Sequence, residues 1–89
     1  MSYSFEIVPS CKKDIEKLTK RNSVLKKALE NKMSEILQHP QHYKPLQYDL
    51  AGEKRVYIMK SFVLKFEIDE ERKAVVFLFF GHHDEAYKT

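Results

Sequence analysis

The sequence predicts an α+β fold in which a two-helix hairpin packs on one face of a small, mainly antiparallel β-sheet. Two apolar runs near the C-terminus, residues 62–68 (FVLKFEI) and 74–80 (AVVFLFF), flank a charged turn at residues 69–73. Aromatic and β-branched residues on both sides of solvated charges are typical of a β-hairpin. Residues 25–37 instead repeat apolar side chains every three or four positions, as an amphipathic helix does. Together with an alternating segment at residues 2–8, these patterns predict the order β-α-α-β-β-β.

The N-terminal strand and the first helix have clear patterns. The strand places three apolar side chains on one side, namely Tyr3, Phe5 and Ile7. Ser10 is a good N-cap residue, so the first helix is expected to start there. Cys11 lies at helical spacing from Ile15 and Leu18, which predicts a small buried side chain rather than a nucleophile.

The second helix has the stronger apolar pattern. Either Asn22 or Ser23 is expected to cap its start, and Pro40 is expected to stop it. Its inward stripe is predicted to be Leu25, Ala28, Leu29, Met33, Ile36 and Leu37. Residues 41–45 are then predicted as a loop, and residues 46–50 as a short edge strand.

The later strands are expected to present one face to the helices and to leave the other open. Residues 54–60 and 62–68 alternate, whereas residues 74–80 are apolar at nearly every position, which places that strand in the middle of the sheet. The helix-facing side chains are predicted to be Val56, Ile58, Phe62, Leu64 and Phe66. The open face is predicted to carry Arg55, Tyr57, Val63 and Lys65.

Length and composition indicate a single domain over residues 1–89. The 43% hydrophobic content supports one modest core, so a partner is expected to add stability. No apolar run reaches membrane-spanning length and charges occur from Glu6 onward, so neither a membrane segment nor a signal peptide is expected. The single cysteine excludes an internal disulfide and favours a reducing, cytoplasmic setting. The net charge of +3 fits nucleic-acid binding and an ordinary solvated surface alike.

The most apolar strand ends in a cluster of titratable groups, GHHDEAYK at residues 81–88. With Arg55, Tyr57 and Lys65 on the open face, these residues are suited to handling RNA. Cations hold phosphate and aromatic rings stack on unpaired bases. Histidine and tyrosine can move protons during attack of a ribose 2′-hydroxyl on its own phosphate. The strand residues also fit an ordinary outer face of solvated charges, with Tyr57 half-buried.

Four histidines raise the question of zinc. His82 and His83 are adjacent, and adjacent strand residues point to opposite faces, so the pair does not readily hold one ion. No cysteine pair supports a site, and neither a metal nor another cofactor is expected. Of the two histidines, His82 is predicted to be buried and hydrogen-bonded, and His83 to be functional.

Several motifs resemble the RelE/ParE superfamily of toxins from type II toxin–antitoxin modules. They are the PL…L-x-G…R-V-Y-I entry to the sheet, the strand SFVLKFEI and the C-terminal GHHDEAY. The resemblance covers the whole domain and is greatest to the RelE and YafQ-like branch, whose members cleave messenger RNA in the ribosomal A site. It implies a metal-independent endoribonuclease that acts on mRNA at the ribosome. It also implies silencing by a cognate antitoxin, RelB-like or another small protein.

The resemblance further implies roles for individual residues. His83 falls on the general acid/base histidine of YafQ-like toxins, and Tyr87 on the aromatic residue four positions later. Arg55 lies near a sheet lysine of RelE, while Tyr57 and Lys44 fall on histidines of the branch. The expected catalytic residues are therefore His83, Tyr87, Arg55 and Lys65. The expected RNA-binding residues are Lys44, Lys54, Tyr57, Lys60 and His82.

Two positions depart from the family pattern. Val63 stands where RelE carries a strand arginine, and Ser61 stands where YafQ carries an acid. Lys65, Lys54 or His82 can supply the missing charge; otherwise the chain is a catalytically weakened relative. A ParE-like gyrase inhibitor is the other alternative, although that branch lacks the histidine and tyrosine set. A double-stranded-RNA-binding module is disfavoured, because such modules place one helix before and one after three strands.

Overall fold

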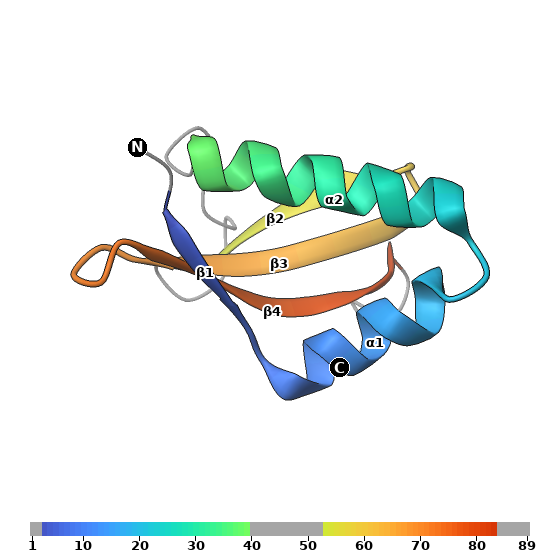
Figure 1. Cartoon of the computed structure of the whole chain (residues 1–89), viewed down its shortest axis with the longest axis horizontal. Coiled ribbons are helices and arrows are strands. Elements are labelled where there is room, and N and C mark those ends of the chain that lie inside the picture. The colour runs from blue at the N-terminus through green and yellow to red at the C-terminus, as the bar shows by residue number, and fades with distance from the viewer. Residues whose placement is uncertain (1–2, 40–52, 84–89) are drawn as a thin grey trace.

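The computed structural model describes residues 3–39 and 53–83, and its two helices lie on one face of a four-stranded sheet (Figure 1). The elements in chain order are β1 (Ser4–Ile7), α1 (Pro9–Thr19), α2 (Ser23–Gln38), β2 (Glu53–Ile58), β3 (Phe62–Asp69) and β4 (Ala74–His82). The strand order is β1-β4-β3-β2, with β1 parallel to β4 and the other pairs antiparallel. The predicted α+β fold and its element order are confirmed. The loop and edge strand predicted within residues 41–50 lie outside the described residues.

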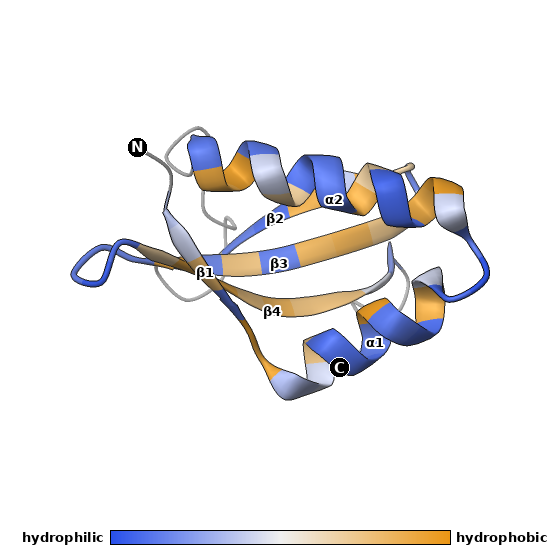
Figure 2. Cartoon of the chain, viewed as in Figure 1, coloured by the Kyte–Doolittle hydropathy of each residue, from blue (hydrophilic) through white to orange (hydrophobic). Residues whose placement is uncertain are grey.

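β4 is an inner strand of the sheet, as its continuous apolar sequence predicts. It pairs with β1 on one side and with β3 on the other. Val75, Phe77 and Phe80 have no exposed surface and belong to the core between the sheet and the helices. Figure 2 shows the apolar stretches of β3 and β4 beneath helices whose outer sides are largely hydrophilic. Burial of this apolar surface is the main force that holds the helices on the sheet.

The start of α1 differs from the sequence prediction. The helix begins at Pro9, so Val8 rather than Ser10 is the N-cap residue, and no side chain caps it. Proline suits the first helical turn because its φ is already near the helical value and its missing N–H would have no partner there. Val8 is extended, with φ −64° and ψ 149°, as residues before proline usually are. The predicted Ser10 cap is therefore wrong.

α2 does have a side-chain cap at its start. Asn22 Oδ1 accepts a hydrogen bond from the Leu25 backbone N–H at 3.0 Å, which confirms one of the two predicted caps. The predicted inward stripe is also confirmed: Leu25, Leu29 and Ile36 are buried, and its other members pack against the same core. Neither described helix is long and apolar enough to span a membrane.

Both hairpin turns place non-glycine residues in the left-handed region. Met59 and Lys60, between β2 and β3, have φ values of 53° and 65°, and Lys73, just before β4, has a φ of 51°. Successive left-handed residues in a tight turn match the twist of the strands that they join. In the second turn, an Asp69 carboxylate oxygen accepts a hydrogen bond from the Arg72 backbone N–H at 3.2 Å. Each turn thereby helps to fix the register of its hairpin.

An irregularity in β4 decides which of its side chains face the helices. Phe79 is the partner of Lys65, but Phe77 is already the partner of the next residue of β3, so Leu78 has no partner there. Such a β-bulge adds one residue to a strand and exchanges its two faces beyond that point. Phe77 therefore faces the core before the bulge, and Phe80 faces it after the bulge.

Candidate nucleic-acid site on the open sheet face

The open face of the sheet carries cations beside aromatic rings. The strand register aligns Arg55 with Lys65 and Phe79 across three strands. The Arg55 guanidinium carbon lies 5.8 Å from the centre of the Tyr57 ring, and Lys65 Nζ lies 5.7 Å from the centre of the Phe79 ring. Both distances are typical of cation–π contacts. This face therefore offers charges that can hold phosphate and rings that can stack on bases.

Val63 lies in the next row of the same face. It pairs with Tyr57 on one side and with Gly81 on the other. It has no exposed surface, yet it does not belong to the core on the helix side of the sheet. The predicted placement of Val63 is thus confirmed, and this position gives the site an apolar floor instead of a charge.

His83 meets this face where β4 ends. Its ring centroid is 5.5 Å from that of Tyr57, and the two ring planes are inclined by 44°. Its backbone N–H donates a hydrogen bond to the Ser61 carbonyl oxygen at 2.8 Å, which ties the end of β4 to the β2–β3 turn. Both rings are accessible, and Tyr57 has 47% of its surface exposed. The imidazole of His83, which can transfer protons, therefore contacts the same Tyr57 ring that the Arg55 guanidinium contacts.

His82 lies on the other side of the sheet. It pairs with Phe62, which packs against the helix-side core, and their ring centroids are 4.6 Å apart. The side chain is exposed, so the predicted burial of His82 is wrong. His82 is the last residue of β4, two positions past the fully buried Phe80, and the burial of the strand ends there. The two adjacent histidines thus face different surroundings, as strand alternation predicts.

Lys54 does not share the open face with Arg55. Side chains alternate along β2, and Lys54 has the same parity as Val56 and Ile58, which belong to the helix-side core. Only 8% of its surface is exposed. The predicted place of Lys54 among RNA contacts on and around the open face is therefore corrected: the alternation of β2 itself turns this side chain toward the helices.

The remaining predicted site residues are Lys60, Lys44 and Tyr87. Lys60 is exposed in the β2–β3 turn, close in sequence to the Ser61 carbonyl that His83 contacts. Lys44 and Tyr87 lie outside the described residues, so their expected roles stay predictions.

Thiol and metal chemistry have little support in the described part of the chain. Cys11 is 1% exposed, and burial together with the nearby charge of Asp14 raises the pKa of its thiol to about 11. A thiol of this kind stays protonated near neutral pH and is a poor nucleophile. Within residues 3–39 and 53–83, no three His, Cys, Asp or Glu side chains are grouped so that they could hold a metal ion.

Phe79 is a member of this face that sequence reasoning missed. The run from 74 to 80 is apolar throughout, and periodicity cannot say which of its rings face outward. The adjacent pair Phe79-Phe80 contained a usable signal, because neighbouring strand residues point to opposite faces and only one of the two can enter the core.

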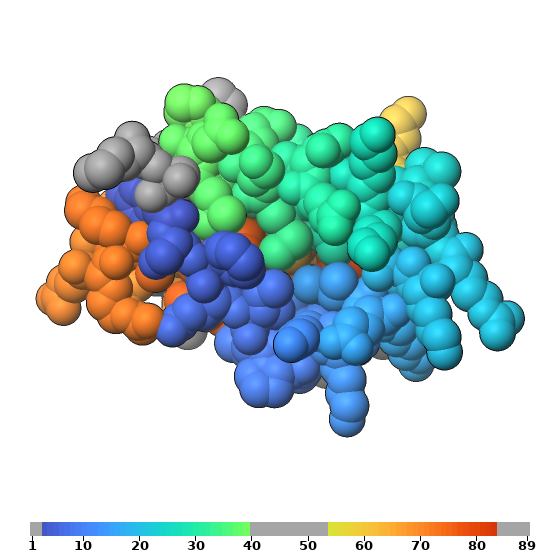
Figure 3. All heavy atoms as spheres, in the orientation of Figure 1, coloured from blue at the N-terminus to red at the C-terminus, as the bar shows by residue number. Residues whose placement is uncertain are grey.

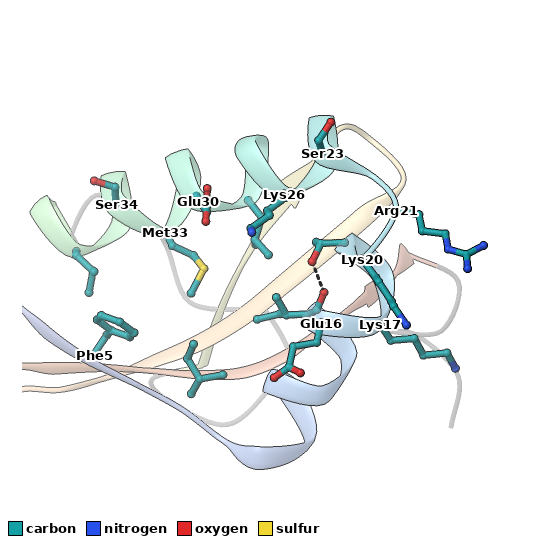
Figure 4. Close-up of a pocket in the computed structure, with 15 residues that line it drawn as sticks. Phe5, Glu16, Lys17, Lys20, Arg21, Ser23, Lys26, Glu30, Met33 and Ser34 are labelled. Atoms are coloured by element: carbon teal, nitrogen blue, oxygen red, sulfur yellow. Dashed lines mark hydrogen bonds between the residues drawn. The ribbon is translucent and has the colours of Figure 1, made fainter.

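The helix side of the molecule contains a groove between α1, α2 and β1, with a volume of about 1340 Å³. Figure 3 shows the hollow between α2 and the β1–α1 segment, and Figure 4 shows Phe5 and Met33 pointing toward it. Its apolar lining is formed by Phe5, Ile7, Ile15, Leu29, Met33 and Leu37. Among the described residues, its charged lining has four cations and two carboxylates: Lys17, Lys20, Arg21, Lys26, Glu16 and Glu30.

The chain also matches proteins that have been described before. The family model of the "ParE toxin of type II toxin-antitoxin system, parDE" matches residues 5–87. The curated protein named "Putative toxin RelE4" from Methanocaldococcus jannaschii is 51% identical over 86 residues, which cover 97% of this chain and 92% of that protein.

Solved structures of toxin–antitoxin complexes contain similar chains. A chain of the RelBE2 complex from Mycobacterium tuberculosis has a TM-score of 0.74 and 26% identity, with 93% of each chain covered. A chain of the Escherichia coli DinJ–YafQ complex has a TM-score of 0.78 over 99% of this chain and 100% of that one, and its 17% identity supports the fold alone. The family match, the curated relative and the shared fold agree, and the chain belongs to the RelE/ParE superfamily as a RelE-family toxin of a type II toxin–antitoxin system.

Proposed function

We propose that this toxin is a ribosome-dependent endoribonuclease that cleaves messenger RNA in the A site and so inhibits translation. The observation that carries the proposal is the contact between His83 and Tyr57, with the Arg55 guanidinium beside the same ring. A proton-transfer group, an aromatic ring and a cation thus meet at one accessible site. Cleavage of RNA without a metal uses these three kinds of group.

The proposed reaction is an internal transfer at one phosphodiester. The ribose 2′-hydroxyl gives its proton to a base, and the 2′-oxygen attacks the adjacent phosphorus. The bond from phosphorus to the 5′-oxygen breaks, and this oxygen takes up a proton. The products are a 2′,3′-cyclic phosphate and a free 5′-hydroxyl.

His83 is the proposed proton-transfer residue, because histidine can gain and lose a proton between about pH 5 and 8. Tyr87 is its proposed partner. Arg55 and Lys65 are proposed to stabilise charge on the phosphate oxygens. A single proton-transfer group contributes about 10²–10⁴-fold to the rate. The ribosome is therefore proposed to contribute the orientation of the message.

Cleavage of mRNA on purified ribosomes tests this proposal. His83→Ala should lower the cleavage rate by about 100-fold or more, and the wild-type product should end in a 2′,3′-cyclic phosphate. His82→Ala is the matched comparison, because it removes the adjacent imidazole from the other side of the sheet, and it should lower the rate far less. Wild-type rates in both variants would rule out the histidine mechanism and leave Lys65 and Arg55 as candidates.

The proposed partner in the resting cell is the cognate antitoxin, with an amphipathic segment seated in the groove between α1, α2 and β1. The apolar lining can take an apolar side of such a segment, and the surplus of cations favours acidic side chains beside it. The similar chains in RelBE2 and DinJ–YafQ come from toxin–antitoxin complexes, which supports an antitoxin for this chain as well. The cytoplasm, where ribosomes work, is the proposed location.

The alternative is a ParE-like inhibitor of DNA gyrase, which the description of the matching family model favours. The meeting of His83, Tyr57 and Arg55 on one face favours the nuclease. A supercoiling assay separates the two functions, since inhibition of gyrase by toxin that leaves ribosomal mRNA intact would establish the alternative.

A further inference from the structure

The contact between Tyr57 and His83 crosses the sheet. Tyr57 is on β2, His83 follows β4, and β3 lies between these two strands. The ring centroids are nevertheless 5.5 Å apart, with the planes inclined by 44°. Rings at about 4.5–7 Å in such tilted arrangements attract one another. The aromatic neighbour of the His83 imidazole therefore comes from β2 and not from β4.

The strand register explains how the two rings can meet. Tyr57, Val63 and Gly81 form one row across the three strands. Gly81 contributes no side chain, and Val63 is short and fully buried. Neither residue therefore places a long side chain between Tyr57 and His83, and the two rings can approach each other over this row. Glycine at position 81 is suited to this close approach, because any other residue would place a Cβ there.

The Tyr57 ring also contacts a cation, the guanidinium of Arg55. Arg55 is two residues before Tyr57 on the same face of β2, and its guanidinium carbon is 5.8 Å from the centre of the Tyr57 ring. Arg55 is itself half-buried. The Tyr57 ring is thus in contact with a guanidinium on one strand and an imidazole across the sheet, which restricts the orientations open to it.

We infer that Tyr57 is a positioning residue for His83, whose imidazole it holds toward the scissile phosphate through its ring. The inference rests on the proposed nuclease function and assigns the residue that orients its proton-transfer group. Displacement of a reacting group by about 1 Å can lower a rate by about 100-fold, so this orientation matters for catalysis. The contact joins the two rings, so the ring of Tyr57 is assigned the role.

NMR spectroscopy of the folded toxin with labelled histidine side chains tests the contact directly. The wild type should show a nuclear Overhauser effect between the ring protons of Tyr57 and His83. Tyr57→Leu should shift the His83 ring-proton resonances, because the ring current is lost, whereas Tyr57→Phe should leave them near their wild-type positions. Val24→Ala is the control, since Val24 is 66% exposed on α2 and lines neither site, and it should change none of these signals.

Ribosomal cleavage kinetics test the consequence. Tyr57→Leu should lower kcat by up to about 100-fold with a smaller change in KM, and Tyr57→Phe should recover most of that loss. Absence of the Overhauser effect in the wild type overturns the inference, and this readout needs no variant to fold. A rise in KM alone for Tyr57→Leu also overturns it, because Tyr57 would then be an RNA contact. Wild-type cleavage by His83→Ala would instead overturn the nuclease mechanism, even where the ring contact is observed.

Discussion

The side-chain oxygen of Asn22 lies 3.0 Å from the backbone nitrogen of Leu25 and accepts its hydrogen bond. The start of a helix leaves four N–H groups without helical partners, and this bond satisfies one of them. α1 has no equivalent side-chain cap. The helix that contributes the fully buried Leu25 to the core is therefore also the one whose start is fixed by a side chain.

Removal of this cap should destabilise the fold. Asn22→Ala should lower the free energy of unfolding by about 1 kcal/mol, because the Leu25 N–H loses its acceptor. Urea and thermal unfolding measure the change. Asn31→Ala, at an exposed position of the same helix, is the control and should be neutral or slightly stabilising, since alanine is the better helix former. Equal losses in both variants would contradict the capping role.

The β2–β3 turn should gain stability from glycine at position 60. Lys60 has a φ of 65°, a region that costs residues with a Cβ about 1–2 kcal/mol. Lys60→Gly and Lys60→Ala remove the same charge, but only glycine relieves the backbone. The glycine variant should therefore unfold at a higher urea concentration than the alanine variant. Equal midpoints would show that the left-handed turn carries no strain.

Alkaline destabilisation should depend on Cys11. Burial, with a smaller contribution from Asp14, raises the pKa of this thiol from 9.0 to about 11 in the folded protein. The thiol therefore stabilises the fold fully below pH 9, and that contribution is lost as the pH rises toward 11, because the unfolded chain releases its proton first. The stability difference between wild type and Cys11→Ala should change steadily over this window. Lysine and tyrosine side chains are the same in the wild type and in Cys11→Ala, so their effects cancel in this difference. A stability difference that does not change with pH would contradict the raised pKa of Cys11.

RNA binding should depend on salt through the open face. Arg55→Ala and Lys65→Ala should weaken binding to ribosomes or RNA, and each should reduce the slope of log affinity against log salt concentration by about 0.7 per lost phosphate contact. Their stability should change by no more than about 1 kcal/mol, because each variant loses one cation–π contact. Lys12→Ala, which removes an exposed cation from α1, should keep the wild-type slope. An unchanged slope in both open-face variants would place the RNA on another surface.

Antitoxin binding should depend on the groove. Phe5 is 53% exposed and lines it, whereas Val24 is 66% exposed and does not. Phe5→Glu should weaken the affinity for the co-expressed cognate antitoxin by at least about tenfold, because a carboxylate would lie on the apolar lining. Val24→Glu adds the same charge elsewhere and should bind as the wild type does. Equal affinities for the two variants would exclude this groove as the docking site.

Most of the fold could be predicted because burial leaves a strong periodic signal in a chain this short. The stripe of α2 and the continuous apolar run of β4 both correspond to buried faces. The start of α1 was misplaced because Pro9 and Ser10 both favour a helix start, but at different positions, and proline took the first helical residue.

The site was less predictable because it depends on features that leave no periodic trace. The β-bulge at Leu78 contains neither glycine nor proline, so the sequence did not predict it. His82 was expected to be buried, but it is exposed, since a sequence does not tell at which residue of a strand burial ends. Lys54 was a different case, because the alternation of β2 already assigned it to the helix side.

Leu78, which has no partner in β3, decides which histidine at the end of β4 faces the open side of the sheet. If β4 kept all its residues and paired with β3 without the bulge, the alternation would be unbroken, and the outward place now held by His83 would fall to His82. Because His82 and His83 are adjacent, one of the two would face the open side of the sheet with or without the bulge. Among related chains, a gap placed within this strand therefore decides which histidine is equivalent to which. Equivalence here follows the side of the sheet rather than the count of residues along the chain.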